Sequence, residues 1–142
     1  MIQIHAMSLS VALALAPALA AQDRDSHPRE LTQAWSSVSQ KSAADKQTWA
    51  FIHFEPDGTY RAVRVEVSAG GVPQVGTVIK GRWAILRTEV RGRLLCARVD
   101  GAGQSRCTPY QVARGGTQLS WNELSFVRAD SSLVRRWELK EF

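Results

Sequence analysis

Residues 49–68 read WAFIHFEPDGTYRAVRVEVS, two runs of alternating apolar residues joined by Pro-Asp-Gly at residues 56–58. Proline presets φ at the first position of a turn, and glycine takes the left-handed conformation that ends a three-residue hairpin loop. In this register Phe51 faces Val63, and Trp49 shares the face of Phe51. A two-residue loop would shift the pairing by one and exchange the faces of the first strand. The three-residue loop is favoured because it pairs the bulky apolar residues, and we expect that face to line the core.

Further alternating runs follow the hairpin, separated by short glycine-rich or polar turns. The expected strands are residues 77–87, 94–99, 105–113 and 133–142. Before the last of these, Leu119 and Trp121 fit one alternation and Leu124 and Phe126 the opposite one, which predicts a bulge or bend near Asn122-Glu123. Seven or eight strands at this spacing are typical of a barrel or a sandwich. The fold class predicted is therefore all-β, a single antiparallel up-and-down β-barrel of about eight strands. Its last strand would pair with the first and remove both edges.

One segment before the hairpin has the spacing of a helix instead. Leu31, Ala34, Trp35 and Val38 recur at intervals of three and four residues, which predicts a short N-terminal helix over residues 27–40. An opening strand is the alternative for the same segment.

The first twenty residues form a separate apolar segment, MIQIHAMSLSVALALAPALA. Ala18-Leu19-Ala20 has the small-x-small form of a signal-peptidase site, and polar residues follow it. We therefore expect a secretory signal peptide at residues 1–20, cut after Ala20 or Ala21, and one barrel domain at residues 21–142. The other interpretation is a retained apolar helix, which at about 15 residues is too short to span a bilayer. The n-region lacks Lys and Arg. A periplasmic or secreted location, in a Gram-negative bacterium, is predicted.

The two cysteines agree with export. Cys96 and Cys107 flank the turn-rich residues 100–103, and a hairpin centred there places the two cysteines directly opposite each other. A structural disulfide is expected, on the outer face of the hairpin; two free buried thiols are the alternative.

The composition is that of a globular domain, with 44% apolar and 22% charged residues and a net charge of +5. It excludes a disordered tail, a collagen and a coiled coil. The 14 Arg against 4 Lys suggest either a surface that faces an acidic protein or an envelope anion, or ordinary solvated strands. The second is favoured because the arginines are spread along the chain. No nucleic-acid partner and no later transmembrane segment are expected.

The order of short motifs along the chain resembles the bacterial lipocalin-like, calycin-type family of small exported barrels. The resemblance covers about residues 30–140. It rests on Leu31 and Trp35, on Phe54, Asp57, Gly58 and Tyr60, on Gly81 and Trp83, and on Arg135, Arg136 and Trp137. It implies a barrel that can hold a small apolar ligand, and it implies no chemistry.

The residues themselves offer little for catalysis or metal binding. His53, beside Glu55, is a candidate base, but a half-buried strand histidine with a hydrogen-bond partner is favoured. His27 lies in the N-terminal flank. We therefore expect no enzyme activity, no cofactor and no metal site.

The tryptophans suggest a binding function, although core filling is the competing interpretation. The predicted function is an exported protein that binds a small hydrophobic or amphipathic ligand. The alternative is a protein-interaction module of the cell envelope, such as an inhibitor of a cell-wall hydrolase, that uses the basic barrel surface. Arg135 is expected to point inward, toward a ligand carboxylate or stacked on Trp35 or Trp83. The candidate lumen residues are Trp49, Phe51, Trp83, Tyr110, Trp121 and Arg135.

Overall fold

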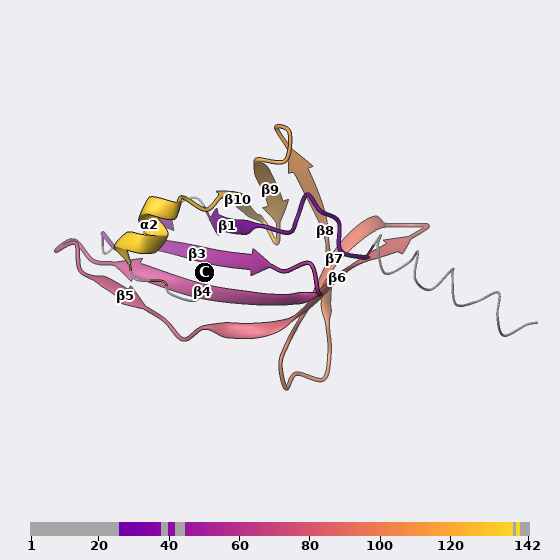
Figure 1. Cartoon of the computed structure of the whole chain (residues 1–142), viewed down its shortest axis with the longest axis horizontal. Coiled ribbons are helices and arrows are strands. Elements are labelled where there is room, and N and C mark those ends of the chain that lie inside the picture. The colour runs from indigo at the N-terminus through magenta and orange to yellow at the C-terminus, as the bar shows by residue number, and fades with distance from the viewer. Residues whose placement is uncertain (1–25, 38–39, 42–44, 138, 140–142) are drawn as a thin grey trace, which may run out of the picture.

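The computed structural model describes residues 26–37, 40–41, 45–137 and 139, and the expected signal peptide lies outside them. Within these residues the chain forms ten strands and one helix (Figure 1). They are β1 (Ala34–Ser37), β2 (Gln40–Lys41), β3 (Gln47–Phe54), β4 (Thr59–Val67), β5 (Pro73–Val75), β6 (Ile79–Thr88), β7 (Gly92–Val99), β8 (Arg106–Ala113), β9 (Gln118–Trp121), β10 (Leu124–Arg128) and α2 (Ser131–Arg136).

Eight of the strands close an antiparallel barrel, as the alternating pattern predicts. Around the barrel the order is β1, β3, β4, β6, β7, β8, β9 and β10, and β10 returns to pair with β1. Strands that follow one another in this order are therefore hydrogen-bonded neighbours in the barrel. Strands β2 and β5 add to β3 and β4 respectively.

The β3–β4 hairpin has the predicted register but the opposite face inward. Phe51 pairs with Val63, which confirms the three-residue loop. Phe54 and, in part, Ile52 pack in the barrel interior, whereas Phe51 belongs to a second apolar cluster on the outer face. The expectation that Trp49 and Phe51 line the core of the barrel is wrong. Both faces of this hairpin are apolar, so alternation alone does not identify the inner one.

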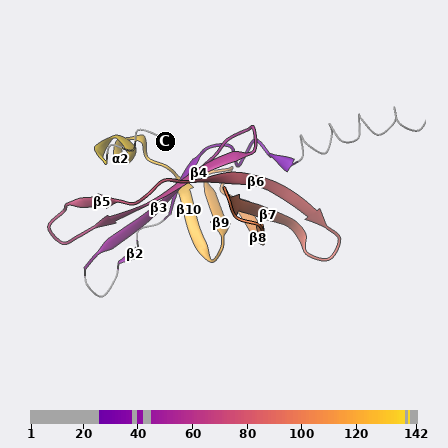
Figure 2. The ribbon, with the colours of Figure 1, turned by 90° about the horizontal axis from the view of Figure 1, so that it is seen from below.

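The outer cluster is covered by Leu133, Trp137 and Leu139, within the strand predicted over residues 133–142, of which residues 138 and 140–142 lie outside the described residues. The chain instead forms α2, whose N-cap Asp130 accepts a hydrogen bond from the Ser132 N–H at 2.8 Å. Helical spacing places Leu133 and Trp137 on one side, and both pack on the outer cluster. Figure 2 shows α2 beside the β3–β4 hairpin. The closing strand of the barrel is β10.

The N-terminal helix predicted over residues 27–40 is also wrong, because residues 27–33 form turns and bends and β1 follows them. Strand β1 pairs with β10 on one side and with β3 on the other. These two ladders satisfy the β1 backbone groups, and their pairing overrides the helical spacing. Leu31 and Trp35 both enter the interior, where the Trp35 Nε1 donates to the Leu31 carbonyl at 3.2 Å.

The predicted bulge near Asn122-Glu123 is a two-residue turn between separate strands. Both residues have positive φ, 52° and 62°, as in the tight turns of β-hairpins. Leu124 pairs directly with Trp121. Apolar residues of β9 and β10 thus share one face, which explains the change of phase in the sequence.

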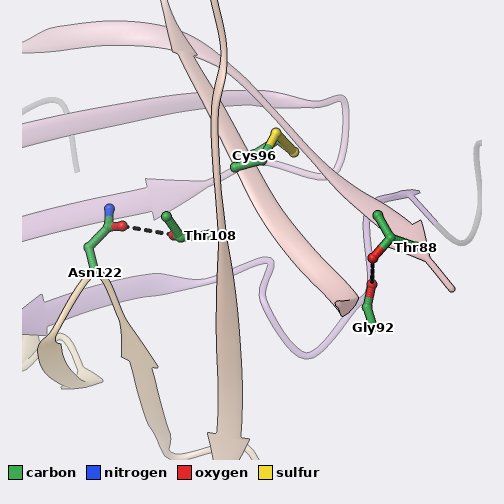
Figure 3. Close-up of a disulfide and its surroundings, with 6 residues drawn as sticks. Thr88, Gly92, Cys96, Thr108 and Asn122 are labelled. Atoms are coloured by element: carbon green, nitrogen blue, oxygen red, sulfur yellow. Dashed lines mark hydrogen bonds between the residues drawn. A yellow bond between two sulfur atoms is a disulfide. The ribbon is translucent and has the colours of Figure 1, made fainter. Parts of the chain in front are cut away.

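The disulfide between Cys96 and Cys107 is present, and the two residues are directly opposite in β7 and β8 (Figure 3). This confirms the hairpin register inferred from the sequence. A disulfide also indicates an oxidising, non-cytoplasmic environment.

Replacing Phe51, which is fully buried, tests the outer cluster. We expect F51A to lower the free energy of unfolding by about 3–5 kcal/mol, because a large side chain leaves a cavity. Val72 is 65% exposed, so V72A should change stability by less than about 0.5 kcal/mol. Urea denaturation of both variants measures this, and equal effects would contradict the cluster.

Thiol titration of the denatured, unreduced protein should detect no free thiol. Reduction should lower the free energy of unfolding by about 3 kcal/mol or less, because the bridge closes a short loop. Two titratable thiols in protein from an oxidising environment would contradict the bridge.

Candidate functional site

A cavity of about 460 Å³ opens where β8, β9 and β10 meet, beside the β9–β10 turn. Its apolar wall is formed by Tyr110, Trp121 and Leu124. The polar residues around it are Gln111, Ser120, Asn122, Glu123 and Ser125. This volume lies within the range of small-molecule sites.

Strand pairing brings the apolar wall together. Tyr110 pairs directly with Trp121, and Trp121 pairs with Leu124, so the three side chains lie on one face of adjacent strands. The Thr108 Oγ1 donates to the Asn122 Oδ1 at 2.8 Å and fastens the β9–β10 turn to β8 (Figure 3). The cavity wall is therefore held by backbone ladders and by a side-chain bond.

Two polar atoms of this wall are buried without a partner in the described part of the chain. They are the Tyr110 hydroxyl oxygen and the Trp121 Nε1. A buried donor without an acceptor costs about 1–3 kcal/mol, and such groups are uncommon in folded proteins. Both atoms are donors that lack an acceptor, in two residues that border the cavity.

Burial raises the pKa of the Tyr110 hydroxyl, and Arg93 opposes the shift. Glu30 adds a smaller upward effect, and Arg87 a small downward one. A raised pKa keeps the hydroxyl protonated at neutral pH, so it remains a hydrogen-bond donor.

Trp83 lies in the barrel interior in one cluster with Trp121, and Tyr110 packs against that cluster. The Trp83 Nε1 is satisfied, because it donates to the Glu55 carbonyl at 2.9 Å. The Trp83 ring packs on Phe54 with their centroids 5.0 Å apart, and Phe54 is 6.0 Å from Trp121. Trp83 therefore fills the core next to the cavity and does not line it.

The other three candidate lumen residues lie elsewhere. Trp49 and Phe51 face Trp137 on the outer side of the barrel, with ring centroids 4.8 and 5.7 Å from it. Arg135 is exposed on α2, where its Nε donates to the Ser131 carbonyl at 3.3 Å. The inward placement of Arg135 followed from a strand that is in fact a helix.

Sequence reasoning missed the contribution of Leu124 and of the β9–β10 turn to the site. The signal was present as the change of phase at Asn122-Glu123. Reading it as a hairpin turn would have placed Leu124 opposite Trp121.

The candidate base His53 belongs to a polar cluster with Glu55 and Arg61. The Arg61 Nη2 donates to the His53 Nδ1 at 3.0 Å and to the Glu55 Oε1 at 2.9 Å. His53 therefore acts as an acceptor on its Nδ1 in this geometry. Burial lowers the pKa of His53; Glu55 works against the shift, and Arg61 adds to it.

Among the described residues, no three His, Cys, Asp or Glu side chains gather as a metal site. The described residues contain no helix with the length and apolar character of a membrane span. The comparisons found no matching protein-family model, no similar curated protein and no similar solved structure.

The lowered pKa of His53 predicts a pH dependence of stability. The unfolded chain binds the proton more readily, so stability is fully present above the ordinary pKa of about 6.5 and falls as the pH drops below it. The free energy of unfolding of wild type should therefore fall between pH 7 and pH 5 more than that of H53Q. Urea denaturation across this range measures it, and parallel profiles would refute the assignment to His53.

Proposed function

We propose that the protein binds a small amphipathic ligand in the cavity of Tyr110, Trp121 and Leu124. The observation that carries the proposal is the pair of buried, unsatisfied donors, Tyr110 Oη and Trp121 Nε1, in two residues that border that cavity. A ligand acceptor atom that reaches them removes the cost of leaving them unpaired.

The wall also limits the kind of ligand. Two aromatic rings and a leucine offer apolar contact, and the turn residues supply a polar rim. The interior next to the cavity is filled by Phe54 and Trp83, which are 0% and 2% exposed. A compact ligand with an apolar ring and a hydrogen-bond acceptor suits this site better than a long acyl chain.

In this proposal the ligand-binding protein is an exported, calycin-type barrel. The closed eight-strand barrel and the disulfide support it, together with the order of motifs from Leu31 to Trp137. In this proposal the protein works in the periplasm as a ligand carrier or sensor and performs no catalysis.

Titration with Nile red tests the proposal, because this dye is neutral, aromatic and carries a carbonyl acceptor. We expect saturable dye fluorescence that accompanies a change in tryptophan emission. Y110F keeps the ring and removes one donor, so it should weaken binding about fivefold, the value of one hydrogen bond. W121F should weaken binding by a similar or larger factor.

W49F is the matched control, because Trp49 packs on the outer face against Trp137. It should bind the dye like wild type. If W49F lost as much affinity as W121F, the proposed site would be refuted. It would also be refuted if Y110F, W121F and W49F all bound the dye as wild type does.

A further inference from the structure

A second cavity, of about 340 Å³, lies on the outer face of β6 and β7. Its walls include Arg82, Arg98, His27, Cys96 and Ser105. None of its lining residues is acidic, and it shares no residue with the cavity at the β9–β10 turn. Two arginines and a histidine therefore line the same cavity.

The two arginines are directly opposite each other in the β6–β7 ladder. Like charges at such positions destabilise a sheet. In the described part of the chain neither guanidinium has a hydrogen bond or a salt bridge. The Asp57 carboxylate acts on Arg82 electrostatically. However, its Oδ1 accepts hydrogen bonds from the Thr59 N–H at 2.9 Å and from the Thr59 hydroxyl at 2.6 Å. Asp57 is therefore an ionised counter-charge to Arg82 that lies outside the cavity lining, and no acidic residue lines the cavity itself.

The remaining walls are fixed by covalent and hydrogen bonds. The disulfide of Cys96 ties β7 to β8 under the cavity. The His27 Nε2 donates to the Trp83 carbonyl at 2.8 Å, and its ring stands edge-on to the indole at 4.9 Å. These bonds hold the walls of the cavity in place, whereas the side chains of Arg82 and Arg98 are exposed.

We propose that this cavity binds a phosphate group, free or as a monoester. Guanidinium groups bind oxyanions through two parallel N–H donors. A tetrahedral phosphate presents oxygens in several directions and can accept from Arg82 and Arg98 together, whereas a carboxylate has two oxygens in one plane. The Ser105 hydroxyl supplies a neutral donor at the rim. The cavity exceeds the size of the ion alone, which leaves room for the group that a phosphate monoester carries.

Isothermal titration with inorganic phosphate in chloride buffer tests the site. We expect wild type to bind it, and R82Q and R98Q to lose about tenfold or more in affinity, since each removes a charge-assisted contact. R91Q is the matched control: it removes the same charge from an exposed position on the β6–β7 turn. R91Q should bind phosphate as wild type does.

A second arm distinguishes the source of the phosphate. Vesicles of phosphatidylcholine containing phosphatidic acid present the monoester on a lipid surface, and pure phosphatidylcholine vesicles do not. Binding of either probe that depends on Arg82 and Arg98, and not on Arg91, supports the site and identifies the source. Equal losses in R91Q, unchanged affinity in R82Q and R98Q, or no binding of either probe would overturn it.

Thermal unfolding separates a folding defect from a binding defect. Without phosphate, R98Q should melt at or above the temperature of wild type, because it removes the repulsion between the two arginines. With phosphate, wild type should be stabilised more than either variant. Both variants should bind Nile red as wild type does, so failure of this site and failure of the proposed function remain distinguishable.

Discussion

The pairing of β1 with β10 is the constraint on which the barrel depends. Trp35 of β1 pairs with Arg128 of β10, and the same short strand pairs with β3 on its other side. Without this closure, β1 and β10 would each present an open edge of unpaired backbone groups. Closure also encloses Trp35 and Leu31, both fully buried. A four-residue strand is therefore enough to join the two ends of the sheet.

The β3–β4 hairpin has a buried surface on each face. Its inner face carries Phe54 into the barrel, and its outer face carries Phe51 into the cluster beneath α2. Burial of one phenylalanine side chain stabilises the fold by about 1.5–3 kcal/mol relative to exposure. The C-terminal helix keeps the outer face out of water, so Trp137 stabilises the hairpin without entering the barrel.

Both candidate binding cavities depend on residues that face each other across neighbouring strands. Tyr110 and Trp121 border one cavity and carry two buried donors, and Arg82 and Arg98 place two positive charges in the wall of the other. The first pair costs the folded state free energy because its hydrogen bonds are unsatisfied. The second pair costs free energy because like charges repel. An acceptor atom relieves the first and an anion the second, so the two cavities favour different ligands.

Local chemistry in the sequence determined the registers of two hairpins, those that pair Phe51 with Val63 and Cys96 with Cys107. Turn residues and the alternation of side chains act over a few residues, so the sequence shows them without knowledge of the fold. Which face of β3 points inward, and that the chain after Asp130 forms a helix over the outer face, were decided by tertiary packing. Both faces of β3 are apolar, and their assignment depends on contacts with segments as distant in the chain as Trp137 and Leu139.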